Sequence, residues 1–218
     1  MTAIYDPHAA WYDEYVTDSP YMAMVDGVLA ELLGRGHGTV LEIGCGTGAH
    51  AAALRSTGRT PVGVDISAGQ LSFAAGKLPV ARADAGRLPV ASGSLDAVAS
   101  VLIHTDVPDY RAAVREAARV LRPGGVLAHV GVHPCFTGAF SDRSDPDRVI
   151  ITSELYGHTG VSFHAWTSEG VRARVGARHL PVSDLVNAFL DAGLTVDRLT
   201  ERGMGPLPDV LGISARKA

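Results

Sequence analysis

The chain has 218 residues, of which 46% are hydrophobic and 19% charged, and its formal net charge is −4 at pH 7. This composition indicates a globular protein of one domain with a sizeable core. The acidic balance disfavours nucleic acid as a partner, because a phosphate backbone is bound by clustered Lys and Arg side chains.

No stretch approaches the roughly 18 apolar residues of a membrane span, and residues 1–12 lack the apolar run of a signal peptide. We therefore expect a cytoplasmic protein without a membrane partner. The two cysteines, Cys45 and Cys135, show no metal-ligand spacing, so no metal site is expected.

The first 38 residues are expected to form a helical cap. Aromatic residues gather between Thr2 and Thr17, which indicates that this segment packs against another part of the protein. Apolar residues at helical spacing then predict a helix over Tyr21–Leu33 that ends at Gly34.

From residue 39 the sequence alternates between short apolar runs and segments with helical periodicity. Such alternation predicts βαβ units and a parallel sheet. The expected strands are Thr39–Ile43, Thr60–Val64, Val80–Ala83, Leu95–Leu102 and Gly125–Val132, and the expected helices are Ala49–Ser56, Ser67–Ala75 and Tyr110–Leu121.

The alternation breaks after the fifth expected strand. Residues 134–180 contain scattered polar residues, prolines, glycines and aromatics, and a long stretch of this kind inside a compact domain is usually functional. We therefore predict a lid over a substrate pocket. A helix over Ser183–Ala192 and two strands, Leu194–Thr200 and Val210–Ala215, are expected to close the domain as an antiparallel hairpin.

The predicted fold is α/β: a Rossmann-like, doubly wound, mostly parallel sheet of seven strands with a C-terminal antiparallel hairpin strand and a lid insertion after the fifth strand. The whole chain, 1–218, is expected to be a single domain. Its parts are the helical cap (1–38), the cofactor-binding core (39–133), the substrate lid (134–180) and the closing helix and hairpin (181–218).

The first expected strand runs into the turn Gly44-Cys45-Gly46-Thr47-Gly48. Ligands of open α/β sheets bind beyond the carboxyl ends of the strands, and glycine lets a ligand approach the backbone closely. Asp65 ends the next strand, 21 residues after Gly44, where its carboxylate can accept hydrogen bonds from ribose hydroxyls. Gly44, Gly46 and Ala49 also satisfy the dinucleotide-binding pattern. These residues alone therefore leave a nicotinamide enzyme and a methyltransferase both open.

Five segments in order resemble the motifs of class I S-adenosylmethionine-dependent methyltransferases. They are Val40–Gly48, Val64–Ser67, Ala83–Pro89, Leu95–Asp109 and Arg119–Gly125, the last of which reads Arg-Val-Leu-Arg-Pro-Gly-Gly. Within this class the chain is most similar to the ubiquinone- and menaquinone-biosynthesis type, a broad group that also supplies methyltransferases for natural products.

The resemblance implies S-adenosyl-L-methionine as cofactor and S-adenosyl-L-homocysteine as product. It also implies a set of cofactor contacts, in which the glycine turn lines the methionine and ribose, Asp65 holds the ribose and Asp84 meets the adenine edge. Gln70 departs from the family, which often has an apolar residue there. The implied contact residues are Tyr12, Glu42, Gly44, Cys45, Gly46, Asp65, Ile66, Gln70, Asp84, Ala85, Val101 and His104.

Methyl transfer to oxygen or nitrogen often needs a base near neutral pH, and histidine is suited to that role. His133 ends the fifth expected strand and His179 precedes the closing helix, so both are candidate catalytic residues. Lid aromatics, Trp166 among them, are expected to line the acceptor pocket.

The predicted function is methyl transfer to the O, N or C atom of a small-molecule acceptor, with secondary metabolites among the candidates. The sequence does not decide the oligomeric state. Two alternatives stay open: a nicotinamide-dependent oxidoreductase with a Rossmann fold, and a protein that binds S-adenosylmethionine without catalysis.

Overall fold

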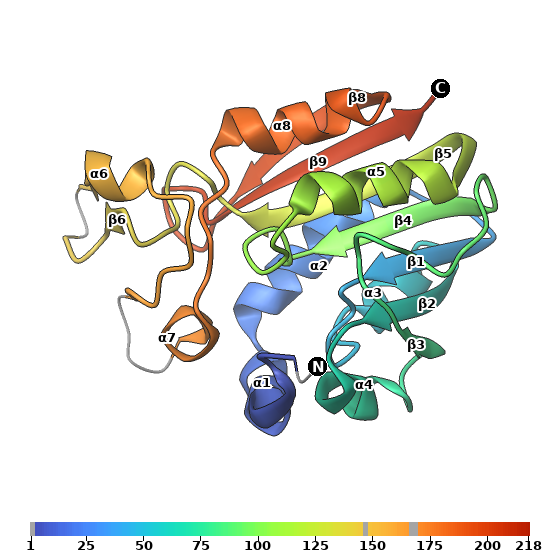
Figure 1. Cartoon of the computed structure of the whole chain (residues 1–218), viewed down its shortest axis with the longest axis horizontal. Coiled ribbons are helices and arrows are strands. Elements are labelled where there is room, and N and C mark those ends of the chain that lie inside the picture. The colour runs from blue at the N-terminus through green and yellow to red at the C-terminus, as the bar shows by residue number, and fades with distance from the viewer. Residues whose placement is uncertain (1–2, 146–147, 166–169) are drawn as a thin grey trace.

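The computed structural model describes residues 3–145, 148–165 and 170–218. A sheet of seven strands runs through the molecule between layers of helices (Figure 1). The helical elements are η1 (Asp6–His8), α1 (Ala9–Val16), α2 (Pro20–Leu33), α3 (Ala51–Ser56), α4 (Ala68–Ala74), α5 (Tyr110–Val120), α6 (Ser153–Tyr156), α7 (Val171–Val175) and α8 (Val182–Asp191). The strands are β1 (Thr39–Ile43), β2 (Thr60–Asp65), β3 (Val80–Arg82), β4 (Leu95–Val101), β5 (Leu121–Val132), β6 (Ser141–Asp142), β7 (Ile150–Ile151), β8 (Leu194–Arg202) and β9 (Val210–Lys217).

The large sheet has the strand order β3-β2-β1-β4-β5-β9-β8. Strands β1 to β5 pair in parallel, whereas β9 is antiparallel to both β5 and β8. The order turns from β2 to β4 at β1, and this is the switch point at which open α/β sheets bind ligands. The predicted Rossmann-like fold with a C-terminal antiparallel hairpin is confirmed.

Successive side chains of β1 point to opposite faces of the sheet. Leu41 and Ile43 pack with the cluster that contains α5 and α8, and Val40 packs with the cluster that contains α2. Because helices cover both faces, β1 is buried on both sides and reads as a continuous apolar run with one exception. That exception is Glu42, whose side chain is 1% exposed.

The N-terminal cap is held against the start of α4. Asp6 Oδ1 accepts hydrogen bonds from the Ser67 hydroxyl at 2.7 Å and from the Gly69 N–H at 3.0 Å. A Cβ at Gly69 would lie 2.9 Å from the backbone oxygen of Asp6, so this close approach requires glycine. These contacts hold η1 and α1 at the carboxyl edge of the sheet.

The described residues of the segment 134–180 form short elements at one side of the molecule, yellow to orange in Figure 1. The sequence predicted little regular structure here, and the described part contains β6, β7, α6 and α7, each of two to five residues. Arg174 of α7 lies 4.4 Å above the ring of Trp11 in α1. The Arg178 N–H donates to the carbonyl oxygen of Thr105 at 2.8 Å. The segment thus contacts both the N-terminal cap and the loop after β4.

Most predicted elements end within two residues of their predicted bounds. The largest difference is β5, which begins at Leu121 rather than Gly125. Leu121 pairs with Leu95 ahead of a register shift, and Gly124 adopts a φ of +77°, so the strand continues through a Gly-rich irregularity that resembles a turn in sequence. Within the described residues, no helix is both long and apolar enough to cross a bilayer.

Candidate functional site

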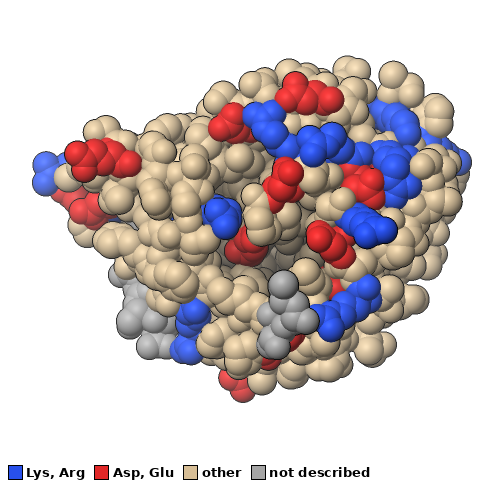
Figure 2. Space-filling model, viewed as in Figure 1, with Lys and Arg blue, Asp and Glu red and all other residues tan. Residues whose placement is uncertain are grey.

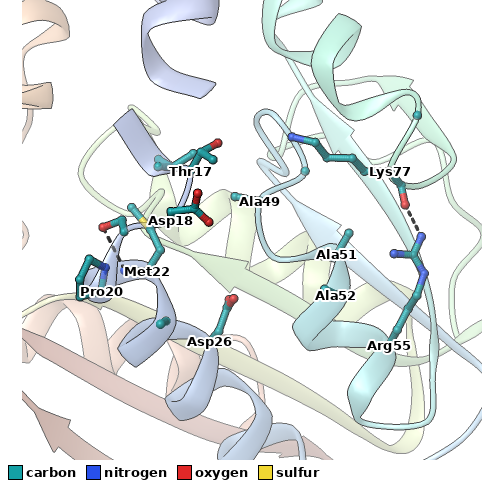
Figure 3. A pocket seen from close by; sticks show the side chains of 15 residues that line it. Thr17, Asp18, Pro20, Met22, Asp26, Ala49, Ala51, Ala52, Arg55 and Lys77 are labelled. Carbon is teal, nitrogen blue, oxygen red and sulfur yellow. Dashed lines mark hydrogen bonds between the residues drawn. The ribbon is translucent and has the colours of Figure 1, made fainter. Parts of the chain in front are cut away.

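Two cavities flank the glycine turn. One, of about 670 Å³, lies between the α1–α2 connection, α2, α3 and the end of α4. Asp18, Asp26 and Lys77 point toward it from three separate segments (Figure 3). The other, of about 560 Å³, lies beyond the carboxyl ends of β1, β2 and β4. Figure 2 shows the face in this view hollowed near its centre, with acidic side chains in and beside the hollow.

The second cavity is the candidate site, because the sequence motifs converge on it. Of the twelve predicted cofactor contacts, Glu42 and His104 are not among its described lining residues, and both are buried. The other ten line it: Tyr12, Gly44, Cys45, Gly46, Asp65, Ile66, Gln70, Asp84, Ala85 and Val101.

The glycine turn is shaped by backbone that side chains do not readily adopt. Gly44 and Gly46 have φ values of +66° and +53°. A Cβ at Gly44 would lie 2.6 Å from Ile103, and one at Gly46 would lie 2.5 Å from Gln70 Oε1. The Cys45 thiol is buried, and burial raises its pKa, which fits a side chain that packs rather than a nucleophile.

Asp65 ties the second strand to this turn. Its Oδ2 accepts a hydrogen bond from the Gly46 N–H at 2.9 Å, and its Oδ1 accepts one from the Ser67 N–H at 2.8 Å. Burial raises the pKa of Asp65, and these two N–H donors counter that rise. Because a carboxylate oxygen can accept more than one hydrogen bond, the side chain can still accept from a ligand in the cavity.

Glu42 lies behind the turn with an unsatisfied carboxyl group. Neither of its oxygens has a hydrogen-bond partner among the described residues. Burial raises the pKa of Glu42 to about 7. His50, which lines the cavity, is paired with Asp26 at 2.6 Å, so that pair separates the two cavities. A buried acceptor without a donor fits a ligand that brings N–H groups, such as an ammonium.

The far end of the cavity, above β2 and β3, is shaped for a flat apolar group with polar edges. Ile66 is 52% exposed although it lies in the cavity wall. Asp84 follows β3, and its Oδ1 accepts from the Gly86 N–H at 2.8 Å. Gln70 is buried at the start of α4, and its carbonyl oxygen stands over Gly46. This combination fits an adenine ring.

The loop after β4 brings another carboxylate into the cavity. Asp106 Oδ2 accepts a hydrogen bond from the Tyr5 hydroxyl at 3.1 Å, and both residues line the cavity. Burial raises the pKa of Asp106 to about 7, and the charge of Asp65 adds to the rise. The hydrogen bonds from Tyr5 and Thr105 and the charge of Arg172 act in the opposite direction.

His104 belongs to the same loop, but its side chain lies in a buried polar cluster. Its ring centroid is 5.2 Å from that of His129, and the Tyr110 hydroxyl lies 2.8 Å from His129 Nδ1. Burial lowers the pKa of His104 to about 3, so the ring is neutral at pH 7. His104 is therefore part of the loop that borders the cavity, but its side chain is not among the described lining residues.

His133, a predicted catalytic residue, is not among the described residues that line the cavity. Its Nε2 lies 2.7 Å from Glu201 Oε1 on β8, and its Nδ1 accepts from the Cys135 N–H at 3.1 Å. The ring also stacks on Phe136. Both ring nitrogens therefore already have partners within the protein, which disfavours the predicted role as a base.

His179 lies in an aromatic cluster of the lid. Its ring centroid is 4.5 Å from that of Phe140 and 4.7 Å from that of Tyr156. Burial, with a smaller contribution from Arg172, lowers its pKa to about 4, and its Nε2 has no hydrogen-bond partner among the described residues. Trp166, the aromatic expected to line the acceptor pocket, lies outside the described residues.

Sequence reasoning missed several residues that line the cavity, Tyr5, His50 and Asp106 among them. Asp106 had a usable signal, since it lies in the loop at the carboxyl end of β4, where a ligand of a parallel sheet is expected. The contribution of Tyr5 depends on how the cap folds back over the sheet, which local sequence does not reveal.

Comparison with known proteins matches this site to one family. Residues 41–129 match the family described as a methyltransferase domain. A demethylmenaquinone methyltransferase of Mycolicibacterium gilvum (strain PYR-GCK) is 32% identical over 146 residues, which are 62% of this chain and 64% of that protein. Over the part that holds the glycine turn and the strand ends of the cavity, this chain is similar to methyltransferases. It spans less than two thirds of the length of the curated relatives it first matches.

Solved structures share the fold at lower identity. An S-adenosylmethionine-dependent methyltransferase from Mesorhizobium loti has a TM-score of 0.71 and 22% identity, and the match covers 93% of this chain and 100% of that one. The [4+2]-cyclase SpnF has a TM-score of 0.63 and 17% identity, with 89% of this chain and 80% of that chain covered. One fold thus includes proteins named for different reactions.

Proposed function

We propose that this protein transfers the methyl group of S-adenosylmethionine to a small-molecule acceptor. The observation that carries the proposal is the convergence of the family's motif residues on one cavity at the switch point of the sheet. The family match over residues 41–129 and the 32% identity to a demethylmenaquinone methyltransferase support the reaction class.

The cavity residues divide the binding of the cofactor among three strands. The turn after β1 lines the amino-acid part, and Glu42 is buried behind that turn, where its unpartnered oxygens would accept hydrogen bonds from the ammonium. Asp65 at the end of β2 holds the ribose, and Ile66 and Asp84 border the adenine. When bound, the cofactor supplies an activated methyl group on a positively charged sulfur.

The protein's own task is then positioning and exclusion of water. We place the acceptor between the N-terminal cap, the loop after β4 and residues 134–180, which we propose to act as the lid. His179 is the candidate base, since its low pKa leaves the ring neutral at pH 7 and free to accept a proton. The same low pKa makes it a weak base, so positioning is expected to dominate catalysis.

Two experiments test the proposal against its alternatives. Titration calorimetry with S-adenosylmethionine, S-adenosylhomocysteine and NAD should show binding of the first two ligands, and equal affinity for NAD would overturn the proposed cofactor. A screen of metabolites by mass spectrometry should then detect an acceptor that gains one methyl group. The cyclase of the same fold makes this second step necessary, since cofactor binding without turnover would support a non-catalytic or different role.

The histidine assignment has its own test. His179→Gln should lower kcat, and the loss should shrink at higher pH, where the acceptor loses its proton unaided. His133→Gln should leave kcat unchanged at each pH, because the structure directs that ring to Glu201. A pH-independent loss in His179→Gln would assign the residue to packing.

A further inference from the structure

The proposed function assigns no role to Asp106, which lines the cavity. Asp106 is a carboxylate in the wall, and neither the ribose nor the amino-acid part of the cofactor is assigned to it. Its side-chain oxygen receives one hydrogen bond across the cavity, from Tyr5 on the N-terminal cap. The question is therefore which part of the ligand meets a carboxylate in this place.

The order of the strands indicates which part of the cofactor lies nearest to Asp106. Asp65 lies at the end of β2 and the glycine turn at the end of β1, while Asp106 comes from the loop after β4, on the opposite side of β1 from β2. In the cofactor, the sulfur joins the ribose to the amino-acid chain. Asp106 is within electrostatic reach of Asp65 and of Tyr12, which line the same cavity.

We propose that Asp106 is the counter-ion of the cofactor's positively charged sulfur, and that it makes the protein bind the sulfonium form more tightly than the neutral thioether product. This inference rests on the proposed function. The sulfur carries a positive charge before methyl transfer and none afterwards, so a carboxylate beside it favours the substrate state and promotes release of the product.

The charges that face Asp106 support this role. Asp65 at the end of β2 is negative, and Tyr5 on the cap and Thr105 on the loop of Asp106 donate hydrogen bonds to Asp106. Tyr12 on the cap lies within electrostatic reach. Arg172 of α7 is the cation that reaches it electrostatically, and its own pKa is lowered by burial. In the protein without ligand, burial raises the pKa of Asp106 to about 7. A positive charge in the cavity would favour the ionised form of Asp106.

The ratio of two affinities isolates this effect. S-adenosylmethionine and S-adenosylhomocysteine share the adenine, ribose, ammonium and carboxylate, so titration of Glu42 or His50 changes both affinities alike. They differ at the sulfur. We therefore expect the ratio of their dissociation constants to favour S-adenosylmethionine at pH 8 and to move toward the thioether by about tenfold at pH 5.5, as Asp106 is protonated.

The experiment is calorimetry of both ligands at pH 5.5 and pH 8 with the wild-type chain, Asp106→Asn and Asp65→Asn. Asp106→Asn should lose the preference for S-adenosylmethionine and its pH dependence, while its affinity for S-adenosylhomocysteine stays within about twofold, which also reports an intact fold. Asp65→Asn should weaken both ligands, while S-adenosylmethionine stays preferred at pH 8 and the preference still falls toward pH 5.5.

Three results would decide against the inference. A wild-type ratio that does not change with pH would overturn it, and so would an Asp106→Asn variant that keeps the wild-type ratio at both pH values. An equal loss of both ligands in Asp106→Asn would make the residue a general part of the site rather than a counter-ion. Failure of the wild-type chain to bind either ligand would overturn the proposed function itself.

Discussion

The core of residues 39–133 and the segment of residues 134–180 are built in different ways. In the core, strands of three to twelve residues pair in one sheet, and β1 and β4 are buried along most of their length. In the following segment, β6 and β7 have two residues each, α6 has four, and side chains such as Phe163 are 54% exposed. The two regions nevertheless border the same end of the sheet.

This difference separates two requirements of a transferase. A cofactor that does not vary can be bound by backbone turns and strand ends, which need a rigid frame. An acceptor that varies among relatives is more readily bound by a segment with few buried contacts, because its sequence can change without loss of the fold. We infer that the core determines the cofactor and that residues 134–180 determine the acceptor.

The largest expected effect tests the rigidity of the core at Gly131 in β5. A Cβ there would lie 2.4 Å from His104 Nδ1 and 2.6 Å from His129 Nε2, both in buried rings. Gly131→Ala should therefore lower the free energy of unfolding by about 3 kcal/mol, as overpacked cores do. Urea denaturation followed by circular dichroism would measure the loss.

A matched control comes from the segment of residues 134–180. At Gly157 the nearest atoms to an added Cβ are 3.7 and 3.8 Å away, which is ordinary contact distance. Gly157→Ala should change the free energy of unfolding by less than about 0.5 kcal/mol. Equal losses in the two variants would contradict the contrast in packing between the two regions.

The second prediction concerns the cofactor. Asp65→Ala should weaken S-adenosylmethionine binding by about 2 kcal/mol, the usual cost of a lost charge-assisted hydrogen bond. Part of the loss should come from the glycine turn, since Asp65 also accepts from the Gly46 N–H. Calorimetry would measure the affinity, and a dissociation constant within twofold of the wild type would show that Asp65 does not hold the ribose.

The third prediction uses the pH dependence of stability. Burial raises the pKa of Glu42 to about 7 in the folded chain, so the folded state holds a proton that the unfolded state releases at lower pH. The wild-type chain therefore loses stability as the pH rises through 7. The neutral variant Glu42→Gln avoids this loss, and without ligand it should be more stable than the wild type at pH 8 by about 1 to 2 kcal/mol.

At pH 5 the advantage of Glu42→Gln should disappear, because the wild-type carboxyl group is then protonated as well. Thermal unfolding at both pH values would measure the difference. Glu154→Gln serves as the control, because Glu154 is exposed in α6 and its replacement should change stability equally at both pH values. An advantage of Glu42→Gln that is the same at pH 5 and pH 8 would contradict the assignment.

The core could be predicted from sequence because its constraints are local. The turn at Gly44 follows an apolar strand and needs positive φ, and Asp65 and Asp84 each come at or just after the end of a strand, so motif and strand order together place them in one cavity. The same local rules placed the hairpin of β8 and β9 within two residues of its observed bounds.

The rest of the site depends on long-range contacts that periodicity does not encode. Tyr5 reaches Asp106 across 101 positions of sequence, and His133 turns to Glu201 across 68. From sequence alone, a histidine at a strand end is a candidate base whether or not its ring has a partner in the fold. Only the position of β8 reveals that the ring of His133 contacts Glu201. His104 is similar, since its burial follows from the packing of Tyr110 and His129 around it.

The smallest expected effect is that of a substitution in residues 134–180 on cofactor binding. Tyr156 lies in α6, in ring contact with Phe140 and His179, and these side chains belong to residues 134–180 rather than to the cofactor cavity. Tyr156→Ala should remove an aromatic wall from the acceptor side and leave the dissociation constant of S-adenosylmethionine within about twofold, or roughly 0.4 kcal/mol. Once an acceptor is known, its KM should rise in this variant.

Weakening of cofactor binding as large as that in Asp65→Ala, with unchanged acceptor kinetics, would show that residues 134–180 support the cofactor site. Because the Arg178 N–H is bonded to the loop that carries Asp106, the backbone offers a route for such coupling, and the side chain of Tyr156 tests whether it is used.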